Sequence, residues 1–92
     1  MTVKEIKAMF IPGQKWRHVW ECGKQKRDEI LTVFKVRTKD IVFNTSNSSQ
    51  YLGAIPKARE IRNAAPGFVW FELAMFSGNV ASVTYTLEKE NE

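Results

Sequence analysis

The feature of this sequence that most limits its fold is a pair of apolar segments near the C-terminal end. Residues 68–76 are almost continuously apolar, and residues 80–87 alternate between apolar and small polar side chains. Between them lie Ser77, Gly78 and Asn79, which are typical turn residues. This pattern predicts a β-hairpin. Because its first strand is apolar on both faces, that strand must be covered on both faces.

Period-two alternation assigns the two faces of this first strand. The side chains expected to face the core are Val69, Phe71, Leu73 and Met75. Those on the opposite face are Phe68, Trp70 and Phe76. This second set needs either an N-terminal helix as a cover or a partner surface, and a second copy in a homodimer is one such partner.

The same alternation predicts three strands upstream of the hairpin. They cover residues 15–21, about 29–37 and 41–43, and a polar turn is predicted at 22–28. One face of the first strand carries Trp16, His18 and Trp20. In the second strand, strict alternation groups Ile30, Thr32, Phe34 and Val36 against Leu31, Val33, Lys35 and Arg37.

A short amphipathic helix is predicted over residues 2–10, where Thr2 and Glu5 have the spacing of a capping box. Three other segments lack a strand pattern: 44–50 predicts a mobile loop, 56–64 a short helix or turn, and 88–92 a frayed acidic tail. The expected fold is a single domain over residues 1–92, α+β but mainly β. It consists of a small, strongly bent antiparallel sheet or barrel of about five strands, with a short N-terminal helix.

The residues that carry chemistry are too few for most enzyme sites. One histidine and one cysteine cannot make a metal site without several carboxylates. On a strand His18 and Cys22 would lie about 13 Å apart, which is too far for a catalytic pair. The five glycines stand singly, so no phosphate-binding loop is formed. We predict that the protein is not an enzyme and holds no metal or cofactor.

The cellular compartment is predicted from the cysteine content and the apolar segments of the sequence. A single cysteine cannot form an internal disulfide, which fits a reducing environment. The first residues lack the apolar segment of a signal peptide, and no run of about 18 apolar residues occurs. The expected location is the cytoplasm, without membrane contact.

Charge and aromatic patterning favour a binding function. The formal net charge is +4. Two groups of cations follow the predicted strands: Lys24, Lys26 and Arg27, then Lys35, Arg37 and Lys39. With Trp16, His18 and Trp20 nearby, they match the way single-stranded nucleic acid is held, by stacking on rings and by contacts to phosphates. The alternative is that the tryptophans form the core of the domain.

Two stretches resemble small SH3-like proteins encoded by phages and prophages. They are Ile11-Pro12-Gly13-Gln14-Lys15-Trp16 after the helix and Ile55-Pro56-Lys57-Ala58-Arg59-Glu60-Ile61 before the last hairpin. The resemblance is one of layout and transfers no functional residue. It implies an SH3-like barrel and a cytoplasmic accessory role, often inhibition of a host or defence component.

The predicted function is therefore a non-enzymatic binding module that contacts a host protein or nucleic acid. The alternative is a small-molecule-binding protein that uses the 44–50 loop as a lid over the sheet.

Overall fold

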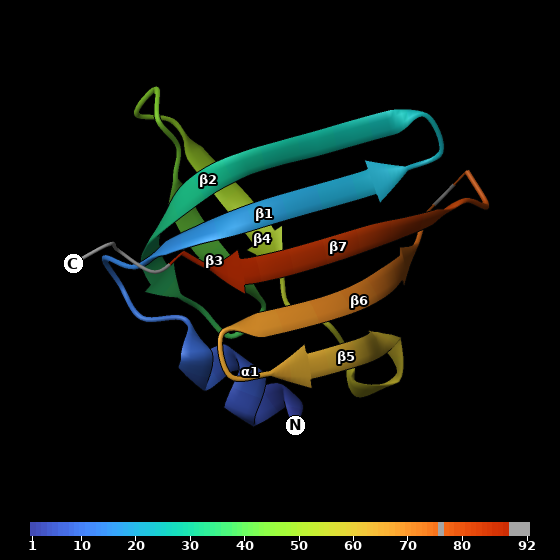
Figure 1. Ribbon diagram of the computed structural model, residues 1–92, viewed down its shortest axis with the longest axis horizontal. Coiled ribbons are helices and arrows are strands. Elements are labelled where there is room, and N and C mark those ends of the chain that lie inside the picture. The colour runs from blue at the N-terminus through green and yellow to red at the C-terminus, as the bar shows by residue number, and fades with distance from the viewer. Residues whose placement is uncertain (76, 89–92) are drawn as a thin grey trace.

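The computed structural model describes residues 1–75 and 77–88. In this part of the chain one short helix accompanies seven strands, which form a single antiparallel sheet (Figure 1). The elements are α1 (Val3–Met9), β1 (Lys15–Cys22), β2 (Gln25–Val36), β3 (Asp40–Asn44), β4 (Gln50–Ala54), the 3-10 turn η1 (Ala58–Glu60), β5 (Ile61–Ala65), β6 (Phe68–Ala74) and β7 (Val80–Leu87). The mainly β fold with a short helix is confirmed, but the predicted number of strands was too low.

The two strands that the sequence did not reveal, β4 and β5, are the edges of the sheet. The strand order is β4-β3-β2-β1-β7-β6-β5, with every neighbouring pair antiparallel. An edge strand has one neighbour, so its alternation of apolar residues is weak. The predicted loop is confined to 45–49, and the helix or turn predicted at 56–64 is only η1, followed by β5.

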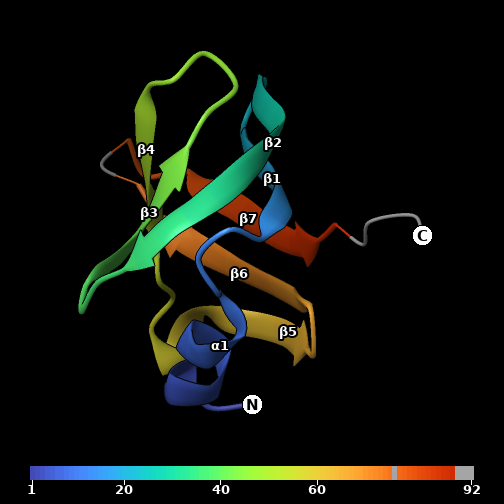
Figure 2. The same cartoon turned by 90° about the vertical axis from the view of Figure 1, so that its left-hand side faces the viewer.

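The sheet is open and strongly bent. β3 and β4 lie behind β1 and β7 in Figure 1, and the turned view in Figure 2 shows the sheet curling on the side of α1. The sheet therefore has an inner face, which α1 partly covers, and an outer face.

The polar segment 22–28, predicted as a turn, is mostly strand. β1 continues to Cys22 and β2 begins at Gln25, so the turn itself contains only two residues. Charged pairs between the strands accompany the backbone ladder of this polar arm. Arg17, for example, donates two hydrogen bonds to Asp28, at 3.0 and 2.7 Å. A charge pattern of this kind is not visible in apolar periodicity.

A β-bulge in β2 changes which residues face outward. Val33 pairs with Phe43 and Lys35 pairs with Val42, so Phe34 is an extra residue. Strict alternation had placed Lys35 and Arg37 on the same face as the core residues Leu31 and Val33, and this assignment was wrong. The bulge reverses the alternation after Val33, so the charged side chains leave the core face.

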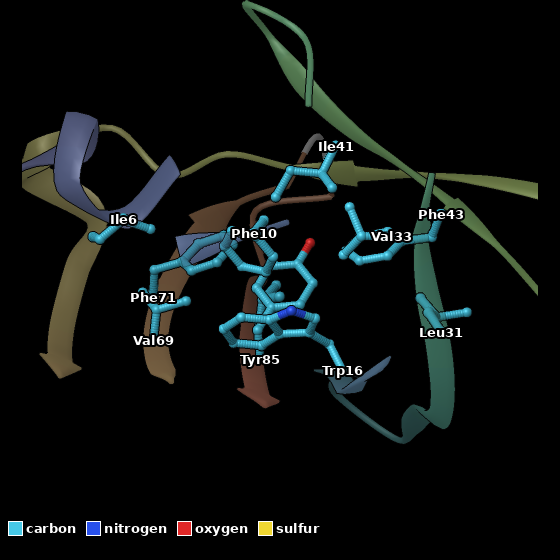
Figure 3. Close-up of a cluster of buried hydrophobic side chains, with 11 residues drawn as sticks. Ile6, Phe10, Trp16, Leu31, Val33, Ile41, Phe43, Val69, Phe71 and Tyr85 are labelled. Atoms are coloured by element: carbon cyan, nitrogen blue, oxygen red, sulfur yellow. The ribbon is translucent and has the colours of Figure 1, made fainter. Parts of the chain in front are cut away.

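The core lies between the inner face of the sheet and α1 (Figure 3). Phe10, directly after α1, stacks on Trp16 with ring centroids 4.2 Å apart. It also meets Phe43 and Tyr85 edge-on, at 6.3 and 5.3 Å. Aromatic pairs at these distances add to the free energy gained by burying apolar area. The buried cluster consists of Ile6, Phe10, Trp16, Leu31, Val33, Ile41, Phe43, Val69, Phe71, Val83 and Tyr85.

Hydrogen bonds at both ends of α1 hold it over this core. The predicted capping box is present: the Glu5 N–H donates to Thr2 Oγ1 at 3.1 Å, and the Thr2 N–H donates to Glu5 Oε1 at 2.9 Å. Beyond the helix, Gln14 Oε1 accepts from the Ile11 N–H at 3.0 Å and from the Trp16 indole N–H at 3.3 Å. The chain leaving the helix is thus tied to the buried tryptophan.

Candidate functional site

The three ring-bearing residues of β1 share the inner face, as predicted, but only one of them is accessible. Trp16 and His18 are buried in the core, and Trp20 is half-buried. Trp20 lies opposite Arg27 of β2 and Val83 of β7. The structure therefore assigns Trp16 and His18 to the core, and a stacking surface made of all three rings does not exist.

His18 is a buried polar side chain that is 1% exposed. Its ring centroid lies 5.0 Å from that of Tyr51 and 5.1 Å from that of Tyr85. Its Nδ1 atom is buried without a hydrogen-bond partner among the described residues. Burial lowers the pKa of His18 from 6.5 to about 4, and the opposing charge of Glu29 does not offset this effect. The imidazole is neutral at pH 7.

We expect the free energy of unfolding to fall as the pH is lowered from 7 to 5. In this range the unfolded histidine, with a pKa near 6.5, takes up a proton, whereas folded His18, with a pKa of about 4, stays neutral. Protonation therefore favours the unfolded chain, by about 2 kcal/mol at pH 5. The measurement is denaturant unfolding at both pH values.

The control is His18→Leu, which fills the site with an apolar side chain and removes the titrating group. Its stability should change much less between pH 7 and pH 5. His18 is the only histidine of the chain, so proton NMR follows it directly. A titration midpoint near 6.5, or an equal loss of stability in the variant, would show that the ring is not held neutral by burial.

The first predicted cation group, at the β1–β2 turn, is largely neutralised by neighbouring carboxylates. Lys26 Nζ lies 3.7 Å from Glu21 Oε1, and Arg27 Nε donates to Glu29 Oε1 at 2.8 Å. Lys24, in contrast, forms no ion pair with any residue that the structure describes. This turn therefore offers an anion one unpaired cation instead of the three expected.

The second predicted group gathers at the β2–β3 turn. Arg37 donates to both carboxylate oxygens of Asp40, at 2.6 and 2.7 Å, and these bonds lower the pKa of Asp40 and raise that of Arg37. Within the described ranges, Lys35 and Lys39 are in no ion pair. Lys7 of α1 reaches the same turn, where its Nζ donates to a backbone oxygen at 3.3 Å. The fold thus adds a cation that the sequence could not assign to this site.

Large exposed apolar side chains extend along the outer face from the middle of β2, opposite Arg17 of β1, to β4. Ile30, Phe34 and Leu52 are 45%, 48% and 56% exposed. Val42 lies between Lys35 and Leu52 in the register and is buried, although it does not belong to the inner cluster. We call this surface the mixed patch. It consists of Ile30, Phe34, Leu52, Lys35, Arg37 and Lys39.

Sequence reasoning missed the apolar half of the mixed patch. Leu52 was missed because β4 was not predicted. Alternation placed Phe34 on the face opposite Leu31 and Val33, as observed, but it put Lys35 on the other face, so only the bulge brings Phe34 and Lys35 together. One signal was present: strict alternation put Lys35 and Arg37 on the core face, and this conflict itself indicates a bulge.

Two surface cavities bear on the small-molecule alternative. A cavity of about 310 Å³ adjoins the start of the 45–49 loop and is lined by Lys15, Ile30, Thr32, Asn44, Thr45 and Ser46. Another, of about 450 Å³, lies between the β1–β2 and β6–β7 turns and is lined by Trp20, Cys22, Gly23, Lys24, Gln25, Met75, Ser77 and Asn79. The loop is held by its own bonds, since the Thr45 N–H donates to the Ser49 carbonyl at 2.9 Å. Its role as a lid stays a prediction.

The face of β6 that was predicted to need a cover lies on the outer side of the sheet. Trp70 is 39% exposed, and its indole N–H donates to Ser82 Oγ at 2.9 Å. Because α1 packs on the inner face, it does not cover Phe68 and Trp70. Phe76, the third member of this predicted face, and the tail beyond residue 88 lie outside the described residues. Self-association through this face stays a prediction.

The remaining chemical groups are dispersed. His18 and Cys22 are both on β1, which is a strand as predicted. Among the residues described, no three His, Cys, Asp or Glu side chains are grouped so as to hold a metal ion. The described helices include none with the length and apolar character needed to cross a membrane.

Comparisons of the chain with protein-family models, with curated proteins and with solved structures find no match.

Proposed function

We propose that this protein is a non-enzymatic binding module that docks an acidic, partly apolar surface of another protein on its mixed patch. The observation that carries this proposal is the grouping of three large exposed apolar side chains with cations on β2, β4 and the β2–β3 turn. Large exposed apolar side chains gathered on one face of a sheet favour an interaction surface. A rim of cations selects a partner of opposite charge and speeds its association.

A protein partner is favoured over nucleic acid by the kind of apolar groups present. Bases stack on aromatic rings, and the mixed patch offers only the ring of Phe34. Ile30 and Leu52 are aliphatic and have no face for stacking, but they suit apolar side chains of a protein. The two most buried rings of β1 are also unavailable to a nucleic acid, because Trp16 and His18 lie in the core.

The resemblance to phage- and prophage-encoded proteins adds a biological setting to this proposal. In that setting the module acts in the cytoplasm as an accessory protein or inhibitor of a host component, and its bent sheet is a variant of an SH3-like barrel. Support for these details comes from the layout of the chain around residues 11–16 and 55–61.

The test is affinity capture from a nuclease-treated lysate of the source cells, with the immobilised protein and two charge-reversed variants. Lys35→Glu combined with Lys39→Glu reverses the cations of the mixed patch that have no described ion-pair partner. Lys24→Glu combined with Lys57→Glu reverses two exposed cations away from the mixed patch. It changes the net charge by the same amount and is the matched control. We expect one protein to be retained in stoichiometric amount by the parent and the control, and at least tenfold less by the patch variant.

The competing outcomes are separated by the same design. Weaker retention at higher salt fits a charged rim. Binding of a labelled single-stranded oligonucleotide at low salt that is lost in the patch variant would favour nucleic acid instead. Equal retention by all three proteins would place the partner on a different surface and contradict the proposal.

A further inference from the structure

The edge strand β4 has backbone groups that point away from the sheet. The Thr45 N–H donates to the Ser49 carbonyl, which makes this a hydrogen-bonded pair. In an antiparallel ladder such pairs alternate, so Tyr51 and Gly53 direct their backbone groups toward β3. The residues whose backbone groups point outward are Gln50, Leu52 and Ala54. The Ala54 carbonyl already accepts from the Tyr85 hydroxyl at 3.2 Å.

This edge lacks the features that protect the other one. On β5, Arg62 adds a charge, and the register shifts between Ile61 and Asn63. A bulge and a charged side chain both discourage pairing with another strand. β4 pairs with β3 in unbroken register and contains no charged residue and no proline. Leu52, at its centre, is well exposed.

We propose that two copies of this chain pair through β4, antiparallel and about a two-fold axis at Leu52. In this register Leu52 lies opposite Leu52 of the second copy, and Gln50 lies opposite Ala54 of the second copy. The outward N–H and C=O groups then face one another in complementary pairs. The Ala54 carbonyl, which accepts from the Tyr85 hydroxyl, would accept a second bond from the Gln50 N–H of the other copy. The two sheets become one continuous sheet, and an isologous contact of this kind closes as a dimer.

A second copy suits this edge better than an unrelated strand does, because of symmetry and charge. The outward groups are distributed evenly about Leu52, so the strand matches itself without a shift. Lys35 lies two strands away in the register, so two copies of it are separated by about 24 Å across the axis. That exceeds the Debye length of about 8 Å at physiological salt. Arg27, which lies over the Tyr51 ring, is already paired with Glu29.

The dimer has a consequence for the outer face. The two Leu52 side chains would stand on the same side of the joined sheet, with Cα atoms about 5.5 Å apart. The mixed patches of both copies would then meet at the axis. The dimer does not depend on the proposed partner, since it rests on the backbone of β4.

The test combines sedimentation with disulfide trapping. Cys22 is the only cysteine, so Cys22→Ser provides a clean background. In this background Leu52→Cys should form a covalent dimer on mild oxidation, because the expected Cα separation is within the range of a disulfide. Asn63→Cys, on the other edge strand, is the matched control. It should form at least tenfold less covalent dimer under the same oxidation.

Sedimentation of the full chain then measures the dimer without a cross-link. The parent should be a dimer at concentrations where Leu52→Lys is monomeric, because two lysines would meet at the axis. Leu52→Thr, which introduces no charge, should stay dimeric. A parent that is monomeric up to several hundred micromolar overturns the proposal. A dimer that survives Leu52→Lys and is lost in Trp70→Glu also overturns it, and assigns self-association to the Phe68 and Trp70 face.

Discussion

Replacing Trp16 with alanine should destabilise the fold by about 3–5 kcal/mol, the range for deleting a fully buried large aromatic side chain. The indole is 0% exposed, stacks on Phe10 at 4.2 Å, and donates to Gln14 Oε1 at 3.3 Å. Its loss leaves a cavity beneath α1 and frees the chain that leaves the helix. The total free energy of unfolding of a domain of this size is only about 5–15 kcal/mol. Urea unfolding followed by circular dichroism measures the change.

The matched control is Trp70→Ala, the same substitution on the outer face. Trp70 is 39% exposed and loses one hydrogen bond to Ser82 when truncated. We expect a cost of about 1–2 kcal/mol, from that bond and the partial loss of packing. Equal costs at the two positions would mean that the inner cluster is not the main core.

Adding a single methyl group at Gly53 should destabilise the protein by about 1–3 kcal/mol, and Gly53→Val should cost more than Gly53→Ala. A Cβ atom at this position would lie 2.5 Å from Phe43 Cε2 and 2.6 Å from the Tyr85 hydroxyl oxygen. Both rings are buried, so neither can move without disturbing the core. The comparison of the two variants by urea unfolding tests the steric origin of the effect.

A double-mutant cycle provides the control for this prediction. Phe43→Leu destabilises the core by itself, but it removes one of the two rings that a Cβ at Gly53 would meet, the one nearest to it. Gly53→Ala should therefore cost clearly less in the Phe43→Leu background than in the parent, since residues in contact are not additive. Strict additivity of the two substitutions would rule out Phe43 as a source of the clash and leave only the Tyr85 hydroxyl.

Elements defined by neighbouring residues could be predicted from the sequence. The hairpin formed by β6 and β7 follows from apolar alternation on both sides of a turn, and α1 from its capping box. The shared face of Trp16, His18 and Trp20 also follows from period two alone. In each case the relevant contacts lie within a few residues or across one tight turn, where local geometry dominates.

Elements that depend on distant partners could not be predicted. β4 and β5 are edge strands that contain a glycine or a charged residue and become strands by pairing with β3 and β6. The ion pairs of the β1–β2 turn were missed because residues 22–28 were predicted as a turn, whereas Arg27 and Glu29 lie two residues apart on the same face of β2. The bulge at Phe34 arises where β2 pairs with β3, and it reverses the face that alternation assigns to Lys35 and Arg37.

By itself, the sequence determined a small, mainly β fold, a strand face shared by three rings and a capped helix, because apolar periodicity and capping patterns are local properties of the chain. Only the tertiary structure decided which side chains of that face are buried and which are exposed. It packed Phe10 on Trp16 and enclosed His18 between Tyr51 and Tyr85, which removed both β1 rings from the surface. It also aligned Leu52 with Lys35 across Val42. The physical reason is that exposure and charge pairing depend on which strands become neighbours, and in this chain those neighbours are set by the register of the whole sheet.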